Sequence, residues 1–307
     1  MSRKMIYAPI AVFAYNRKDK LEYCIEALAQ NEEASETEVF VFADGSKGKQ
    51  DYDKVVQVRD YLNQYAENSV FKHFTVIASE KNQGLANSII RGVTQIVKEY
   101  DRVIVVEDDI IAASDFLSYM NGALEYYNNL KQYGSISAYT ESLKGLDGYK
   151  KDVYATRKGE CWGWGTWRDR WECVDWEVKG FEEFLKNKKM QRQFDKLQAG
   201  ISDMLKDQME GKLDSWAVRW CFHLFRNGLL TVYPKYSRVK NIGFDGSGTH
   251  CTGAEAEVGS IENKNQKCVF ETVGINEALE KENADITRRS IFQRGLDHLV
   301  KKLKGKK

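Results

Sequence analysis

The chain has 307 residues, enough for one large domain or two smaller ones, and its 42% hydrophobic and 30% charged residues indicate a globular protein. Lysine and arginine total 46 and aspartate and glutamate 45, so the net charge of +1 argues against general nucleic-acid binding. No apolar run approaches the roughly 20 residues of a membrane-spanning helix. The six cysteines form no C-x-x-C pair, so reduced thiols in a cytosolic protein are the simplest interpretation.

In the first half of the chain, strand-like and helix-like segments alternate. The apolar stretch from Met5 to Tyr15 imitates a leader peptide, but it has no small-residue cleavage site, so we interpret it as a strand. The expected strands are 6–15, 38–43, 74–78 and one that begins at Val103; the expected helices are 19–29, 52–65, one that begins near Leu85, and 114–130 with Ser114 as its N-cap. This order predicts a mostly parallel sheet with right-handed crossovers.

After Gly134 the pattern is less regular. The expected elements are short strands near Ile136, at 153–156 and at 229–233, a Gly/Trp cluster at 162–176, helices at 181–209 and 215–227, a Gly-rich loop at 237–260 and a last helix that ends near Leu303. We see no repeat and no linker. The predicted class is α/β. We divide the chain into a first half at residues 1–134, an α-rich second half of the same domain at residues 135–275, and a C-terminal basic amphipathic helix at residues 276–307.

Three acidic residues, Glu107, Asp108 and Asp109, directly follow the apolar segment 103–106. Open α/β sheets hold their ligands at the C-terminal ends of such strands. Crowded carboxylates repel one another, and their burial is costly unless a cation or hydrogen-bond donors compensate. Mg²⁺ or Mn²⁺, held by one or two carboxylates and substrate phosphates, meets that need. The alternative is a solvated turn or a helix-capping cluster.

Loops that follow the other strands are expected at the same edge: 14–17, 44–46 and 81–84. Asp44 could accept hydrogen bonds from a nucleoside, or it could simply form the turn of its D-G-S sequence. Gly84 could let a ligand approach a helix N-terminus, or it could be an ordinary loop glycine. Arg17 and Lys81 could neutralise phosphate, although exposed basic residues usually have no specific role.

The segment 105–109, followed by Ser-Asp-Phe-Leu-Ser-Tyr at 114–119, resembles the nucleotide-sugar segment of inverting GT-A (Rossmann-like) glycosyltransferases, above all the N-acetylglucosaminyltransferase I type and bacterial family-two enzymes. The resemblance implies that Asp109 binds the metal and that Glu107 and Asp108 contact the ribose and sugar of the donor. F-A-Y-N-R, F-A-D-G-S and N-Q-G-L-A-N-S are similar to the nucleotide-binding loops of the family. They imply donor contacts at Ala14, Asn16, Arg17, Asp44, Lys81, Asn82 and Gly84.

The resemblance continues downstream in patches to about residue 250. The C-W-G-W-G-T-W sequence at 161–167 resembles an acceptor-side motif and implies acceptor contacts at Trp162, Gly163 and Trp164, although large aromatic residues are usually packing. L-D-S-W at 213–216 is similar to the segment of the catalytic base, which falls on Asp214. An N-cap role for Asp214 in the following helix is the alternative.

This sequence departs from the family in two places. Ser215 stands where the relative carries a second acid, and 172–212 has no clear counterpart.

The loop 243–250 resembles one that closes over the donor diphosphate, which implies roles for Ser247 and for His250 as a diphosphate or second metal ligand. An exposed His250 without a role is the alternative.

Residues 288–307 have a basic amphipathic pattern, so a helix formed by them could rest on an anionic membrane or dock on the domain.

The expected function is a hexosyl- or N-acetylhexosaminyl-transferase that requires Mn²⁺ or Mg²⁺. It would use a nucleoside-diphosphate sugar, most simply UDP-linked, and a glycan or lipid-linked acceptor, in the cytoplasm or at the inner membrane surface. The alternatives are a nucleotidyltransferase, although N-R-K at 16–18 lacks the expected glycine, and a non-catalytic carbohydrate- or metal-binding module.

Overall fold

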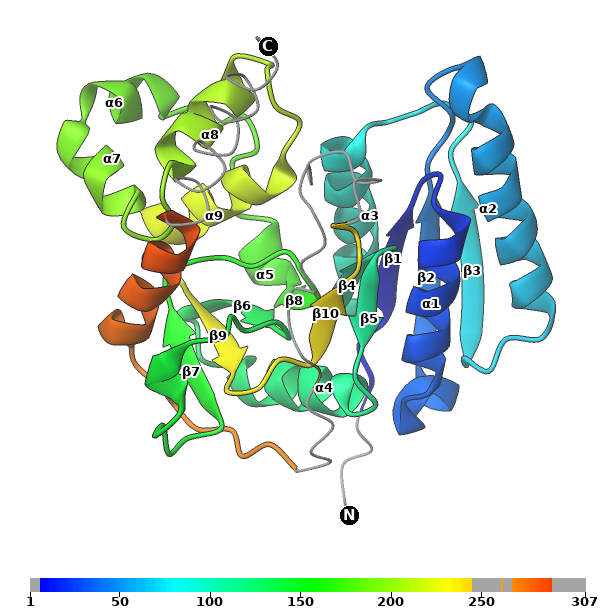
Figure 1. The fold of residues 1–307 in the computed structure, drawn as a ribbon, viewed down its shortest axis with the longest axis horizontal. Helices are drawn as coiled ribbons and strands as arrows, with labels where there is room; N and C mark the ends of the chain where they lie inside the picture. Colours follow the sequence, from blue (N-terminus) through cyan, green and yellow to red (C-terminus); the bar gives the residue numbers. More distant parts are fainter. Residues whose placement is uncertain (1–5, 245–260, 262–266, 289–307) are drawn as a thin grey trace, which may run out of the picture.

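An eight-stranded sheet forms the centre of the molecule in the computed structural model, which describes residues 6–244, 261 and 267–288 (Figure 1). The strand order is β3-β2-β1-β4-β8-β6-β9-β7. Its strands are β1 (Ile10–Ala14), β2 (Glu38–Ala43), β3 (His73–Ala78), β4 (Arg102–Glu107), β6 (Tyr133–Ser137), β7 (Val153–Thr156), β8 (Trp164–Trp167) and β9 (Leu230–Pro234). The first four are parallel to one another, as their order along the chain predicts. The predicted α/β class with a mostly parallel sheet is confirmed.

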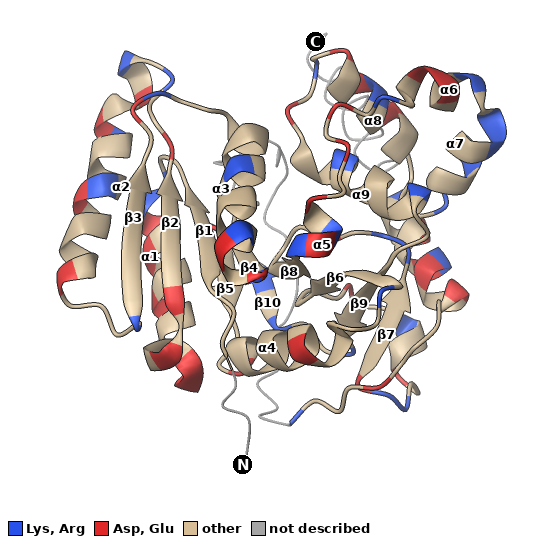
Figure 2. Ribbon diagram, turned by 180° about the vertical axis from the view of Figure 1, so that it is seen from behind, with Lys and Arg blue, Asp and Glu red and all other residues tan. Residues whose placement is uncertain are grey.

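Helices cover both faces of this sheet. In chain order they are α1 (Lys18–Ala29), α2 (Lys49–Glu67), α3 (Leu85–Tyr100), α4 (Phe116–Tyr127), α5 (Arg168–Trp171), α6 (Phe181–Lys186), α7 (Lys188–Phe194), α8 (Ile201–Met209) and α9 (Trp216–Arg226). Helices α1, α2 and α4 pack on one face, and α3, α5 and α9 on the other. Because both faces are covered, β1 and β4 read as continuous apolar runs. Charged residues colour the outer helices, whereas the strands are mostly tan (Figure 2).

The largest difference from the sequence expectation is β8, which comes from the Gly/Trp cluster and lies between β4 and β6. It pairs antiparallel with both strands, so it joins the two halves of the chain into one sheet. Its Trp164 is fully buried and stacks on Trp216, with ring centroids 4.9 Å apart. A second, two-stranded sheet pairs β5 (Ile110–Ala112) with β10 (Val239–Asn241), and β10 lies in the stretch that we expected to be loop.

Two helix predictions are wrong in detail. The single helix expected at 181–209 is divided into α6, α7 and α8, because the Asn187 side chain caps α7 and Gly200 adopts a left-handed φ of 73° before α8. Ser114 is not the N-cap of α4; that position is Asp115. The Asp115 side chain makes no capping hydrogen bond to the helix; its carboxylate forms an ion pair with Arg238, 2.9 Å away.

The last described segment, 277–288, is helical and docks on the domain. Glu280 is buried in an ion pair with Arg157, and Lys158 contacts the Asn283 amide at 3.5 Å. Residues 289–307, which carry most of the predicted basic amphipathic pattern, lie outside the described residues. Within the described ranges of the chain, no helix is long and apolar enough to cross a membrane.

Candidate functional site

The acidic triplet lies where the central strand β4 ends. Glu107 is the last residue of β4, and the Asp108 amide continues the ladder by donating to the carbonyl of Phe13 in β1 at 3.0 Å. Asp108 and Asp109 are buried, with 3% and 8% of their surface exposed. The Asp109 carbonyl also accepts a hydrogen bond from the amide of Ile242, the residue after β10, at 2.9 Å. Backbone hydrogen bonds to two other segments therefore hold the carboxylates at the sheet edge.

Arg17 is the cation that holds this cluster. Its guanidinium forms an ion pair with Asp108 and reaches the Oδ2 atom of Asp109 at 2.9 Å. Burial opposes the charge of Arg17, but the attraction of the two aspartates outweighs that effect and raises its pKa. Burial and the neighbouring carboxylates raise the pKa of Glu107 to about 8, and burial raises that of Asp108 to about 6 against the attraction of Arg17.

Asp109 packs closely against a glycine of a distant segment. An ideal Cβ on Gly243 would lie 2.1 Å from its Oδ2 atom, so this glycine leaves room for the carboxylate that any side chain would fill. Among the described residues there is no group of three or more His, Cys, Asp and Glu side chains that could hold a metal alone. The donor set fits a hard divalent cation held by one carboxylate and completed by substrate phosphates.

The loops after β1, β2 and β3 lie together at the same edge. The Asp44 amide donates to the Ala14 carbonyl at 2.9 Å, and the Asp44 carboxylate accepts from the amides of Gly45 and Gln83, both at 2.8 Å. Asn82 donates to the Gly45 carbonyl at 2.8 Å. An ideal Cβ on Gly45 would lie 2.4 Å from the backbone of the 81–84 loop, so glycine is required there.

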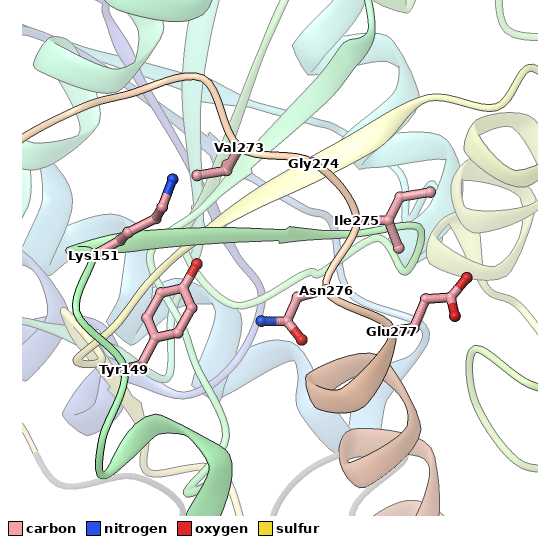
Figure 3. Close-up of a pocket in the computed structure, with 7 residues that line it drawn as sticks. All are labelled: Tyr149, Lys151, Val273, Gly274, Ile275, Asn276 and Glu277. Carbon is pink, nitrogen blue, oxygen red and sulfur yellow. The ribbon is translucent and has the colours of Figure 1, made fainter.

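A cavity of about 260 Å³ lies beside these loops, between β2, β3 and α3. Its lining includes Asp44, Ser79, Gln83 and Arg91. A larger cavity of about 480 Å³ lies elsewhere, next to Tyr149, Lys151 and the segment 273–277 (Figure 3). None of the predicted site residues that the structure describes lines the larger cavity, so it does not bear on the acidic edge.

Asp214 reaches the first half of the chain from the start of α9. Its Oδ2 atom accepts from the Ala86 amide at 3.5 Å, in the first turn of α3. Gly84 has a φ of 76°, and an ideal Cβ on it would lie 2.8 Å from the same carboxylate oxygen. Gly84 therefore admits the Asp214 carboxylate to this helix N-terminus, where we expected a ligand. The N-cap of α9 is Ser215, whose side chain accepts from the Val218 amide, so the capping alternative for Asp214 is wrong.

The two tryptophans predicted to contact the acceptor lie in different environments. Trp164 is in the core and has no exposed surface, so its assignment as an acceptor contact is wrong. Trp162 is half-buried and contacts Tyr139 and Phe244 edge-on, with centroids 4.7 and 5.5 Å away. Gly163 between them has a φ of 62°, which turns the chain from one environment into the other.

The remaining predicted residues are placed as follows. Ala14 ends β1 and is buried, Asn16 lies partly exposed in the turn before α1, and Lys81 is exposed. Ser247 and His250 lie outside the described residues, so their assignments stay predictions. We did not expect a role for Tyr15, whose hydroxyl bonds to Asp51 while Lys47 lies over its ring at 5.6 Å. The sequence signal that could have pointed to Tyr15 was its position directly before Asn16 and Arg17.

Part of this chain is similar to a known protein family, and that part includes the acidic triplet. Residues 10–158 match the family described as glycosyl transferase family 2. The match is to a family of glycosyltransferases, and its residues fall on the strands and helices of the first half of the chain. It covers just under half of the chain, from β1 through β7, and includes the acidic triplet. No curated protein matches the chain.

Three solved structures are similar to this chain. TarS from S. aureus is 18% identical over 46% of this chain and 23% of its own, with a TM-score of 0.33. The mannosyltransferase PcManGT from Pyrobaculum calidifontis, in complex with GDP-Man and Mn²⁺, is 12% identical over 74% and 77%, with a TM-score of 0.40. A putative glucose-1-phosphate thymidylyltransferase from Bacillus anthracis, in complex with a sucrose, is 12% identical over 77% and 90%, with a TM-score of 0.41. The chain thus spans about a quarter of the length of TarS.

The raised carboxyl pKa values predict a pH dependence of stability. A carboxyl group whose pKa is higher in the folded protein stabilises the fold while it is protonated, and this contribution is lost as pH rises through the folded value. For Glu107, with a pKa of about 8, the free energy of unfolding should fall between about pH 5 and pH 9 without added metal. Glu107→Gln should show a smaller fall, because glutamine stays neutral. Urea unfolding at a series of pH values measures this, with exposed Glu99→Gln as the control. Equal pH slopes in wild type and Glu107→Gln would contradict the assignment.

Proposed function

We propose that the protein is a metal-dependent inverting glycosyltransferase that uses a nucleoside-diphosphate sugar, UDP-linked in the simplest case. One observation carries the proposal. The acidic triplet, the Asp44 loop and Asp214 belong to separate segments, and each lies at the edge where the parallel strands end. A donor that spans nucleoside, diphosphate and sugar needs such a row of polar groups along one edge.

Each portion of the donor has a candidate partner. Asp44 lies beside the smaller cavity, where a nucleoside would contact it. Glu107 and Asp108 would face the ribose and the sugar, and Asp109 would hold Mn²⁺ or Mg²⁺ together with the diphosphate. When bound, the cation stabilises negative charge on the leaving diphosphate. Arg17 is within reach of the same position, and its planar guanidinium suits phosphate oxygens as well as carboxylates.

Asp214 is the proposed catalytic base. Its side chain is exposed, whereas the acids of the triplet are largely buried and three of their contacts are taken by Arg17. The first-turn amide of α3 orients the carboxylate through its Oδ2 atom, which leaves the carboxylate open to an incoming hydroxyl. Asp214 would accept the proton of the acceptor hydroxyl as that hydroxyl attacks the anomeric carbon from the face opposite the diphosphate.

The rest of the proposal follows the two halves of the chain. Residues 1–134 would bind the donor, and 135–275 would bind a glycan or lipid-linked acceptor near Trp162. The transferred group would be a hexose or an N-acetylhexosamine. We place the reaction in the cytoplasm, with peripheral contact at the inner membrane surface through the basic residues of 276–307.

The metal assignment is tested by Asp109→Ala. Metal-dependent hydrolysis across a panel of nucleotide sugars should fall by about 10²-fold or more, the scale on which one electrostatic group acts in catalytic sites. Asp53→Ala, which removes an exposed acid on α2, should leave the rate unchanged. Unchanged turnover of Asp109→Ala, with metal still required, would contradict the assignment.

The base assignment is tested by Asp214→Asn, which keeps an acceptor for the Ala86 amide. Transfer to an acceptor should fall by about 10²- to 10⁴-fold, while the affinity for the nucleotide changes little. The rate of transfer at saturating donor and the Kd for UDP with Mn²⁺ separate the two effects. Exposed Asp203→Asn on α8 is the control. A variant Asp214→Asn that transfers sugar at the wild-type rate would exclude Asp214 as the base.

A further inference from the structure

The guanidinium of Arg17 lies beside the aspartates that a divalent cation would also approach. It stands directly before α1, and its side chain crosses to the end of β4. One terminal nitrogen, Nη2, contacts both aspartates, and Nε lies 3.4 Å from the second oxygen of Asp108. The Arg17 side chain is 18% exposed, and those of Asp108 and Asp109 are 5% and 11% exposed. Solvent screening of these pairs is therefore weak.

The charges at this edge balance only in part. Three carboxylates lie in sequence, and among the described residues the ion pairs of this triplet are all with Arg17. Removal of a guanidinium from two buried carboxylates is costly unless another cation replaces it. Conversely, a divalent cation that approaches the Oδ2 atom of Asp109 meets a positive charge already bonded to that oxygen, and the two repel each other.

We propose that Arg17 is an internal counter-ion that competes with the divalent cation for Asp109, so that tight cation binding depends on the diphosphate. This inference rests on the proposed function. A diphosphate brings the negative charge that lets the guanidinium and the cation stay at one edge. Arg17 leaves Asp109 for the diphosphate, with two oxygens of which it makes bidentate charge-assisted bonds, and Asp109 is released for the metal. The residue thereby sets the order of binding as well as contributing to donor affinity.

The experiment measures Mn²⁺ binding to the full chain, by calorimetry or from the signal of free Mn²⁺, with and without UDP. Arg17→Gln should bind Mn²⁺ alone at least about tenfold more tightly than wild type, because a charge that repels the ion has been removed. UDP should strengthen Mn²⁺ binding in wild type and clearly less in Arg17→Gln. Lys18→Gln is the matched control: it removes an equal charge one residue along, from a side chain that pairs with Glu22 on the surface, and should match wild type within about twofold.

The outcomes separate this inference from the proposed function. If UDP strengthens Mn²⁺ binding in wild type but Arg17→Gln binds Mn²⁺ alone no more tightly, the counter-ion role is overturned and the donor site stands. If neither protein binds Mn²⁺ under any of these conditions, both are overturned. Arg17→Met serves if Arg17→Gln does not fold. It also removes the charge that repels the ion and keeps an unbranched apolar side chain, so Mn²⁺ alone should again bind at least about tenfold more tightly, and an unchanged Kd would overturn the role.

Discussion

The structure depends on how three consecutive carboxylates are kept at the end of a buried strand. The apolar strand β4 must lie in the centre of the sheet. The three residues that end and follow it, Glu107, Asp108 and Asp109, are therefore brought to the edge of the sheet despite the repulsion between their carboxylates. Arg17 offsets some of the repulsion, but burial, together with the neighbouring carboxylates, still raises the pKa values of Glu107 and Asp108. A site that tolerates such an imbalance is suited to ligands that bring positive charge with them.

Close approach of backbone to backbone, or of backbone to carboxylate, recurs around this edge. Gly45 lies against the 81–84 loop, Gly84 against Asp214, and Gly243 against Asp109, and each contact is closer than a Cβ would permit. The last two bring carboxylates to chain segments about 130 residues away in the sequence. The glycines thus allow distant segments to share one edge, and together with β8 and β10 they join the second half of the chain to the first.

The sequence predicted the elements whose signal is local. The apolar strands and the amphipathic helix α3 were found because period and hydrophobicity are properties of short windows. Strands β8 and β10 were missed because they are four and three residues long and are stabilised by partners far along the chain. At the site, the edge position of Asp44 and of the triplet followed from strand order. The pairing of Arg17 with two acids, the burial of Trp164 and the contact of Asp214 with α3 depend on tertiary packing, which no local pattern records.

A crystal structure of the protein with UDP and Mn²⁺ tests the central claim most directly, namely that the acidic edge is a donor site assembled from three segments. The account predicts a cation within about 2.0–2.3 Å of an Asp109 oxygen and of two diphosphate oxygens, with the nucleoside against Asp44. Arg17 should have moved from Asp109 to phosphate, and Asp214 should lie open toward the sugar side. A nucleotide bound away from Asp44, or a cation that does not contact Asp109, would contradict the account.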